Sequence, residues 1–297
     1  MNATVEVRQL KKPVLLFGAT SIVGYNLAKT FGDDLAAVVT SKTRTVIPQW
    51  KRLSLAETPE IKEFVRQSGS EILIYCDAVC DVEKCEQNPD WATEINVNNL
   101  RRTLSALTSD VRFVYISSDH VFGGDGHYYE DCVPCPISHY GRTRVTAEKI
   151  VLDHPGSLII RPGLPIGPSL DGRTGHMDWL KYRTGNELPV TIIEDEMRSA
   201  VHTTDLAVRL MELSRSRITG IRHIASTSAV ARPDLAKFLA KQFKIPVTFT
   251  TRLRAQQPYP HLGRVELQTR YMDPLAIPLP SILNNDFKLE SLQLPAH

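Results

Sequence analysis

The chain has 297 residues, a formal net charge of +2 and 42% hydrophobic residues, which suits one large α/β domain or two unequal lobes. Its 35 basic and 33 acidic residues nearly balance, so no basic surface for nucleic acid or membrane is indicated. No apolar run approaches the ~18 residues of a membrane span, and Met1 to Lys12 lack the apolar core of a signal peptide. We therefore expect a cytoplasmic protein with neither nucleic acid nor membrane as partner.

The cysteine and histidine patterns argue against several other classes of site. An odd count of five cysteines without a signal peptide indicates reduced thiols. Cys132 and Cys135 could form a redox pair or half a zinc site, but no second ligand pair at metal spacing is evident. No His/Asp/Glu cluster has metal spacing either, so we expect no metal. The absence of a Ser-His-Asp set disfavours a hydrolase.

Apolar, β-branched runs alternate with helical patterns through the first part of the chain. This alternation predicts right-handed crossovers and an α/β fold with a doubly wound parallel Rossmann sheet. The runs predict strands buried on both faces at 14–17, 35–40, 72–76, 113–117 and 158–161, and helices at 23–31, 59–67, 90–107 and 142–152.

The pattern changes after Arg161, where the segment 162–168 is rich in Pro and Gly. Further on, a strand is expected at 190–193, a helix at 204–214, a strand at 221–225 and a helix at 232–243. We expect a dinucleotide-binding core at 12–162, to which 198–226 returns. Residues 163–197 and 227–297 would form a smaller, discontinuous substrate lobe over the carboxyl edge of the sheet, where such folds bind ligands.

A glycine-containing loop runs from Gly18 to Gly24, directly after the first expected strand. Gly18 allows a tight turn, and Gly24 allows the following helix to pack closely on the sheet. The loop amides and the helix N-terminus would donate hydrogen bonds to a pyrophosphate, although a βα turn without a ligand remains the alternative. The predicted cofactor contacts here are Gly18, Thr20, Ser21, Ile22, Val23 and Gly24.

The end of the second expected strand bears on the choice of cofactor. Sites that prefer NAD place a carboxylate there, on the ribose 2′-hydroxyl. This chain has no carboxylate at that point but offers Ser41, Lys42 and Arg44, which suit a 2′-phosphate. NADP(H) is therefore expected over NAD(H), unless Lys42 and Arg44 are ordinary surface charges.

Three motifs follow one another along the chain: the glycine loop, Ser117-Ser118 at a strand end, and Tyr140 four residues before Arg144. In this order they resemble the short-chain dehydrogenase/reductase superfamily, which has Lys where this chain has Arg144. The resemblance implies that Ser118 binds the substrate carbonyl, that Tyr140 transfers its proton, and that Arg144 holds the nicotinamide ribose and favours tyrosinate. It also implies cofactor contacts from Cys76, Asp77, Ala78, Asn96, Ser117, Tyr140, Arg144 and Pro162.

The segments 115–126, 129–143 and 201–207 narrow this resemblance to the dTDP-4-dehydrorhamnose reductases. They imply an NADPH-dependent reductase of a nucleotide-linked keto-sugar, with Ser118 polarising the carbonyl and Tyr140 as general acid. Members of the branch are often dimers, so a homodimer through the helices at 90–107 and 142–152 is expected. The implied substrate-side residues are Ser118, Asp119, His120, Val121, His176, Met177, Arg198 and Arg264.

The cation at position 144 leaves the function open. Arg keeps a fixed positive charge, but it is larger than Lys, planar, and unable to join a proton relay. The same branch includes the regulatory β subunit of methionine adenosyltransferase, which implies an NADP-binding, non-catalytic alternative. A nucleotide-sugar epimerase is a third possibility. If the chain is an enzyme, Arg144→Lys is expected to preserve or raise turnover.

Overall fold

The computed structural model of the protein describes residues 13–40, 47–246 and 248–284. Ser41, Lys42 and Arg44, the residues expected beside a 2′-phosphate, lie outside the described residues.

Within the described residues, seven parallel strands form the main sheet in the order β12-β7-β5-β4-β1-β2-β3. This order confirms the predicted doubly wound Rossmann-type fold. All five strands predicted in the first part of the chain agree with the structure to within one residue at either end, because each is a mainly apolar run. The strands are β1 (Val14–Phe17), β2 (Leu35–Thr40), β3 (Lys51–Arg52), β4 (Ile72–Tyr75), β5 (Arg112–Ile116), β7 (Leu158–Pro162) and β12 (Gly220–Ile224).

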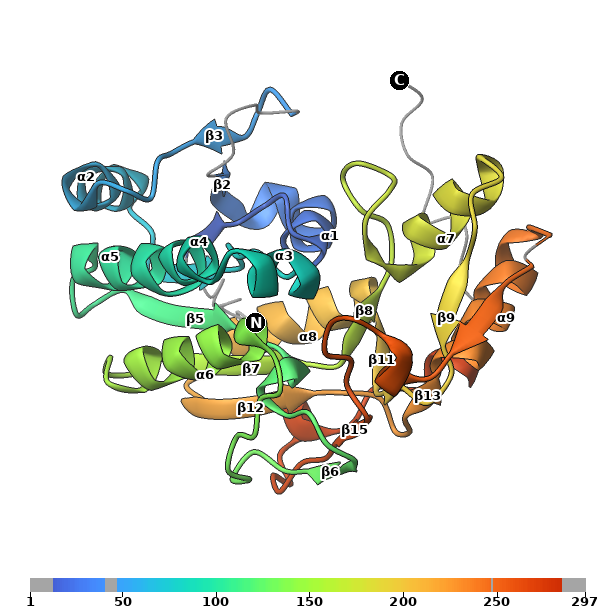
Figure 1. The fold of residues 1–297 in the computed structure, drawn as a ribbon. Coiled ribbons are helices and arrows are strands. Elements are labelled where there is room, and N and C mark those ends of the chain that lie inside the picture. Colours follow the sequence, from blue (N-terminus) through green and yellow to red (C-terminus); the bar gives the residue numbers. More distant parts are fainter. Residues whose placement is uncertain (1–12, 41–46, 247, 285–297) are drawn as a thin grey trace, which may run out of the picture.

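Helices cover both faces of this sheet (Figure 1). The side chains of β1 alternate between the faces, so that Leu16 joins one hydrophobic core and Leu15 the other. The core around Leu16 includes residues of α1 (Ile22–Phe31) and α8 (Thr203–Arg215). The core around Leu15 includes residues of α2 (Thr58–Ser68), α5 (Asn99–Ala106) and α6 (His139–Leu152).

The helix expected at 90–107 is interrupted. The structure has α4 (Pro89–Thr93), a π-helical turn η2 (Glu94–Asn98) and then α5. A further helix, α3 (Val82–Gln87), was not predicted; its cap is Asp81, whose Oδ1 accepts a hydrogen bond from the Lys84 amide at 3.1 Å. Single π turns are frequent at functional sites, and this one carries Asn96.

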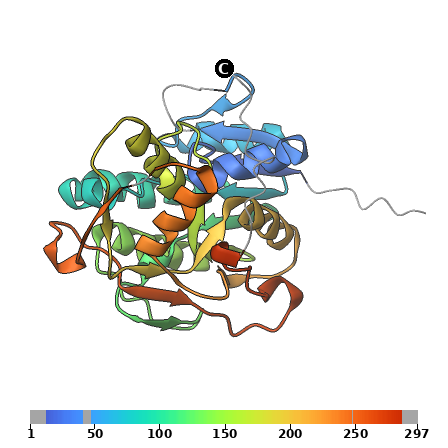
Figure 2. The same ribbon diagram turned by 90° about the vertical axis from the view of Figure 1, so that its right-hand side faces the viewer.

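The remaining elements lie beside the main sheet and form a lobe; in Figure 1, α7, β9, α9 and β13 are at the right and β6 and β15 at the bottom. Helix α9 faces the viewer in Figure 2. A four-stranded sheet within the described residues has the order β13-β10-β15-β6, and β8 pairs with β11 and β9 with β14. The elements are β6 (Gly126–Tyr128), β8 (Leu164–Ile166), α7 (Gly175–Gly185), β9 (Thr191–Ile193), β10 (Met197–Arg198), β11 (Ala200–His202), β13 (Val230–Ala231), α9 (Arg232–Phe243), β14 (Thr250–Arg252) and β15 (Arg264–Leu267). Short 3-10 turns are η1 (Gly32–Asp34), η3 (Asp119–Val121), η4 (Arg254–Gln256), η5 (Pro274–Ala276) and η6 (Ile282–Asn284).

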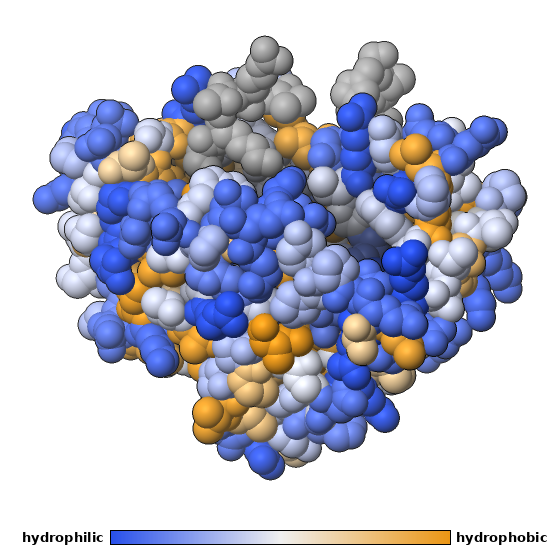
Figure 3. Space-filling model, in the orientation of Figure 1, coloured by the Kyte–Doolittle hydropathy of each residue, from blue (hydrophilic) through white to orange (hydrophobic). Residues whose placement is uncertain are grey.

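The lobe contacts the N-terminal half of α1. Asn26 Nδ2 donates to the Pro168 carbonyl at 2.8 Å. Gly175 has a φ of +70°, and a Cβ there would lie 2.6 Å from Ile22 Cδ1, so α7 begins directly against α1. Figure 3 shows that the surface is hollowed between the sheet domain and this lobe. Among the described residues, no helix has the length and apolar character to cross a membrane.

Candidate active site

The glycine loop has little room for side chains at its two ends. Gly18 has a φ of +79°, and a Cβ on it would lie 2.2 Å from the Asp77 amide nitrogen. A Cβ on Gly24 would lie 2.3 Å from the Gly18 carbonyl oxygen. Ser21 holds the turn: its Oγ donates to the Gly18 carbonyl at 2.9 Å and accepts from the Gly24 amide at 3.0 Å. The result is a closely packed turn that leads into the N-terminus of α1, a backbone geometry suited to a pyrophosphate.

The other predicted cofactor residues differ in burial, and Val23 and Cys76 belong to the hydrophobic core around Leu16. Thr20, Ile22 and Ala78 are partly exposed, whereas the side chains of Val23, Cys76 and Pro162 are buried. The side-chain amide of Asn96 makes its hydrogen bonds within the protein. Its Oδ1 accepts from the Val79 backbone amide at 2.9 Å, and its Nδ2 donates to the Val79 carbonyl and to Thr143 Oγ1, each at 3.0 Å. Asn96 therefore ties the loop after β4 to α6.

Ser117 belongs to a buried ionic network behind the edge. Its Oγ donates to Glu148 Oε1 at 2.5 Å. The same carboxylate accepts from Arg161 Nε at 2.9 Å and from Arg161 Nη2 at 2.6 Å, and the two side chains are 4% and 1% exposed. Sequence reasoning found Ser117 but neither of its charged partners.

Ser118, Tyr140 and Arg144 are brought together. Helix α6 begins earlier than predicted, at His139, because Ser138 caps it by accepting from the Gly141 amide at 3.0 Å. Tyr140 therefore lies in the first turn of the helix. Arg144 Cζ lies 5.1 Å from the centre of the Tyr140 ring, and Ser118 and Arg144 are both close enough to the phenol to lower its pKa. The three side chains the family resemblance named as catalytic thus form one buried cluster.

Burial, more than the neighbouring charge, determines the protonation state of the Tyr140 phenol. Burial raises the pKa of Tyr140 above 10.0, while the Arg144 charge and the Ser118 hydroxyl act in the opposite direction. Tyr140 is therefore a neutral proton donor at neutral pH. Burial also opposes the charge on Arg144, but contacts with Tyr115 and Tyr140 outweigh it and raise the pKa of the guanidinium. Arg144 remains a fixed cation.

A second ionic chain lies on the lobe side of Ser118. Arg198 donates through Nε to Asp119 Oδ2 at 2.6 Å and through Nη2 to Asp119 Oδ1. Arg198 Nη1 also reaches Glu196 Oε1 at 3.2 Å, and Arg232 Nη1 reaches the same oxygen at 3.1 Å. Arg232 Nη2 lies 2.7 Å from His176 Nδ1. Three predicted substrate-side residues, Asp119, His176 and Arg198, are thus joined in one chain.

His120 connects this chain with the cluster of Ser118, Tyr140 and Arg144. Its ring packs edge-on against Tyr140 with centroids 5.1 Å apart. Burial, followed by the Arg198 charge, lowers the pKa of His120 to about 4, so the ring is neutral at neutral pH. Sequence reasoning missed Glu196, Arg232 and His261, which lies 3.4 Å from Glu196. Glu196 could have been singled out in the sequence because it lies two residues before Arg198. Arg232 could be recognised only as the first residue of a predicted helix.

The other predicted substrate-side residues lie outside this chain. Val121 is fully buried in a hydrophobic cluster with Phe122, and Met177 is buried in the hydrophobic core of the lobe. Arg264 is half exposed and pairs with Glu266 at 2.9 Å.

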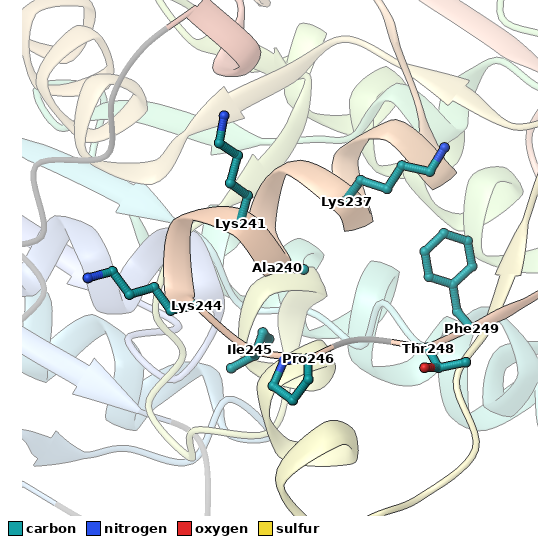
Figure 4. Close-up of a pocket in the computed structure, with 8 residues that line it drawn as sticks. All are labelled: Lys237, Ala240, Lys241, Lys244, Ile245, Pro246, Thr248 and Phe249. Atoms are coloured by element: carbon teal, nitrogen blue, oxygen red, sulfur yellow. The ribbon is translucent and has the colours of Figure 1, made fainter.

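An open groove lies on the C-terminal half of α9 and the segment after it (Figure 4). None of its residues belongs to the two ionic networks or to the Tyr140 cluster, so we do not assign it to the active site. It is lined by Lys237, Ala240, Lys241, Lys244, Ile245, Pro246, Thr248 and Phe249.

We expect the free energy of unfolding to fall as the pH is lowered from about 7 to 4. Burial lowers the pKa of His120 and of His223 to about 4, against about 6.5 in an unfolded chain. Between these values the unfolded state binds more protons than the folded state, so stability rises with pH, by at most about 1.4 kcal/mol per pH unit for each group. Urea unfolding at pH 8, 7, 6 and 5 measures the slope.

The variant His223→Gln tests the assignment of one of these protons. Between pH 6 and 5, the free energy of unfolding should fall less in this variant than in the wild type. The difference in free energy of unfolding between the two proteins at pH 8 serves as the control, because it gives the effect of the substitution where histidine is not protonated. Identical slopes for the two proteins would contradict the role of His223.

Comparisons with known proteins extend over the same elements. The family model described as "RmlD substrate binding domain" matches residues 12–267. A probable low-salt glycan biosynthesis reductase, Agl14, from Haloferax volcanii is 29% identical over 74% of this chain and 76% of its own length. Methionine adenosyltransferase 2 subunit beta from Pongo abelii is 25% identical over 85% of this chain and 80% of its own length.

Among solved structures, dTDP-4-dehydrorhamnose reductase from Bacillus anthracis in complex with NADP superposes with a TM-score of 0.74. It is 20% identical and covers 95% of this chain and 98% of its own, so it supports the fold. The family model spans both the main sheet and most of the lobe, and it confirms the resemblance drawn from the motifs. The chain belongs to the RmlD substrate-binding domain family, within the extended short-chain dehydrogenases/reductases.

Proposed function

We propose that this protein is an NADPH-dependent reductase of a nucleotide-linked keto-sugar. The observation that carries the proposal is the buried cluster of Tyr140, Ser118 and Arg144 at the carboxyl edge of the sheet. It combines a neutral phenol, a hydroxyl beside it and a fixed cation, the groups needed to protonate a carbonyl oxygen as hydride reaches its carbon.

The residues at the sheet edge fit a dinucleotide. Gly18 and Gly24 leave backbone where a Cβ would collide, and the loop ends at the N-terminus of α1, which favours an anion. NADP(H), when bound, supplies or accepts the hydride. The loop would hold its pyrophosphate, Arg144 its nicotinamide ribose, and Ser41, Lys42 and Arg44 its 2′-phosphate. Several related solved structures hold NADP or NAD, among them the reductase from Bacillus anthracis.

The remaining steps belong to the side chains of this protein. Ser118 orients the substrate carbonyl by donating a hydrogen bond to its oxygen, and Tyr140 then donates its proton to that oxygen. Arg144 stabilises the phenolate that results, because its guanidinium lies beside the ring. Asp119 lies beside Ser118 and His120 against Tyr140, and the ionic chain continues from Asp119 through Arg198 to His176; these four residues would bind the sugar. The carboxylates of Asp119 and Glu196 balance the guanidiniums of Arg198 and Arg232, which suits hydroxyl groups.

The proposal predicts oxidation of NADPH by at least one keto-sugar nucleotide. The measurement follows NADPH absorbance with a panel of dTDP- and UDP-linked keto-sugars, and NADPH affinity is measured separately. Tight binding of NADPH without oxidation across the panel would reject the reductase.

A second function, an NADP-binding protein that regulates a partner, is favoured by Arg144 at the lysine position and by the similarity to methionine adenosyltransferase 2 subunit beta. Co-elution with a methionine adenosyltransferase catalytic subunit, together with silence in the panel above, would support it. An epimerase would instead convert a nucleotide-sugar without net consumption of NADPH.

Light scattering tests the expected homodimer, and a monomer at micromolar concentration would rule it out.

A further inference from the structure

The buried guanidinium of Arg144 needs hydrogen-bond acceptors that the smaller ammonium group of a lysine would not need. A guanidinium is a planar group with five donors, and an unsatisfied donor in a buried site costs free energy. Arg144 is 3% exposed. To stay beside Tyr140 it needs an acceptor that fixes its plane, and the choice of acceptor decides how much of its charge remains available.

Tyr115 provides that acceptor. It lies on β5, three residues before Ser118, and is fully buried. Its Oη accepts a hydrogen bond from Arg144 Nη1 at 2.6 Å. Arg144 Cζ lies 5.7 Å from the centre of the Tyr115 ring and 5.1 Å from that of Tyr140, so one guanidinium contacts both phenols.

The anchor itself is rigid. Tyr115 is paired in register with Tyr75 on β4, and the two rings pack with centroids 6.3 Å apart. Tyr75 packs in turn on Phe113, at 5.8 Å. Because β5 is a central strand of the main sheet, the Tyr115 hydroxyl occupies a fixed point from which Arg144 is held.

A phenol differs from a carboxylate as an anchor, and this protein contains both arrangements. Arg161 is held by the carboxylate of Glu148, which neutralises it. Burial raises the pKa of Tyr115 to about 12, so its hydroxyl stays neutral. Tyr115 therefore fixes the guanidinium of Arg144 without cancelling its charge, which remains available to Tyr140.

We propose that Tyr115 is a positioning residue that enables Arg144 to act where the family has lysine, by holding the guanidinium against Tyr140 and the nicotinamide ribose. The proposal concerns the same site as the proposed reductase, and its effect on cofactor binding rests on that function. Its effect on Tyr140 does not, because that effect depends only on the contacts of Arg144 with the two phenols.

The test is a double-mutant cycle of Tyr115→Phe and Arg144→Lys, with Tyr75→Phe as the matched control. The control removes a hydroxyl from the neighbouring buried tyrosine, which makes no hydrogen bond to Arg144 that competes with Tyr115. The titration midpoint of Tyr140 is read from ¹³Cζ-tyrosine NMR of the cofactor-free protein, with the resonance identified by its loss in Tyr140→Phe. NADPH affinity is the second readout.

We expect Tyr115→Phe to raise the Tyr140 midpoint by about one pH unit and to weaken NADPH binding about tenfold, as the loss of a hydrogen bond to a charged group implies. In the Arg144→Lys background, the same substitution should shift the Tyr140 midpoint by less than about 0.3 pH unit and change the NADPH affinity less than about twofold. A lysine has no planar guanidinium for Tyr115 to hold. Equal effects in both backgrounds, or effects no larger than those of Tyr75→Phe, would overturn the proposal. If the wild type binds no NADPH, the reductase assignment fails while the Tyr140 titration still decides the role of Tyr115.

Discussion

Tyr140→Phe is expected to lower the rate of NADPH oxidation about 10³-fold, in line with the loss of a general acid. The substitution removes the only atom of the side chain that can donate a proton and keeps the buried ring against His120 and Arg144. The ring contacts should preserve the fold and the cofactor site, so NADPH affinity should change less than about threefold. The loss should appear in kcat rather than in KM.

Steady-state kinetics on the best substrate of the panel provide the measurement, with Tyr75→Phe as the control for removing a buried phenolic hydroxyl nearby. That control should leave kcat within a small factor of wild type. A Tyr140→Phe variant with wild-type kcat would show that another group donates the proton, and the catalytic assignment of the cluster would then be wrong.

Glu148→Ala is expected to reduce the free energy of unfolding by about 3–5 kcal/mol, the usual cost of breaking a buried ion pair. Arg161 is 1% exposed, and both of its hydrogen bonds to the carboxylate, at 2.9 and 2.6 Å, would be lost. Ser117 would also lose its acceptor. The remaining guanidinium would be a buried charge without a counter-ion, stacked 5.2 Å from the Phe122 ring.

Urea unfolding of the wild type and the variant measures this loss. The matched control is Glu63→Ala, which breaks an exposed helical pair with Arg66 and should have little effect because solvent screens that pair. The double variant Glu148→Leu with Arg161→Met should recover much of the stability, since an apolar pair leaves no buried charge. A single variant as stable as the Glu63→Ala control would contradict the account of this network.

The sequence was sufficient for every strand of the main sheet except β3, whose two exposed residues, Lys51 and Arg52, form no apolar run, and for the first part of the site. Val14–Phe17 and Leu35–Thr40 are strands whose limits follow from local composition, because strands of a parallel sheet are buried on both faces and read as apolar runs. Ser118 and Tyr140 could be paired because a strand end and the following helix meet at the carboxyl edge of such a sheet. The fold and the members of the Tyr140 cluster could therefore be predicted from motifs in chain order.

Local helix signals were less complete. The expected helix at 90–107 is broken by the π turn at Glu94–Asn98, where Asn96 bonds to Val79 and Thr143. The hydrophobic pattern of the sequence runs on through this turn and does not reveal it. Contacts with other segments of the chain stabilise the π turn, and a local pattern cannot show such contacts. Similarly, the Ser138 cap extends α6 by three residues beyond the predicted start at Arg142.

The sequence by itself determined the fold class and the identity of Ser118, Tyr140 and Arg144 as candidates. Only the tertiary structure decided the partners of these residues. In the sequence, Tyr115 is indistinguishable from an ordinary residue of a buried strand. Only the packing of α6 beside β5 brings its hydroxyl to Arg144. Arg232 and Arg198 share Glu196 because β10 pairs antiparallel with β13, directly before α9, and that register joins segments far apart in the chain. Such pairings depend on long-range strand register and buried charge balance, which no local pattern of side chains specifies.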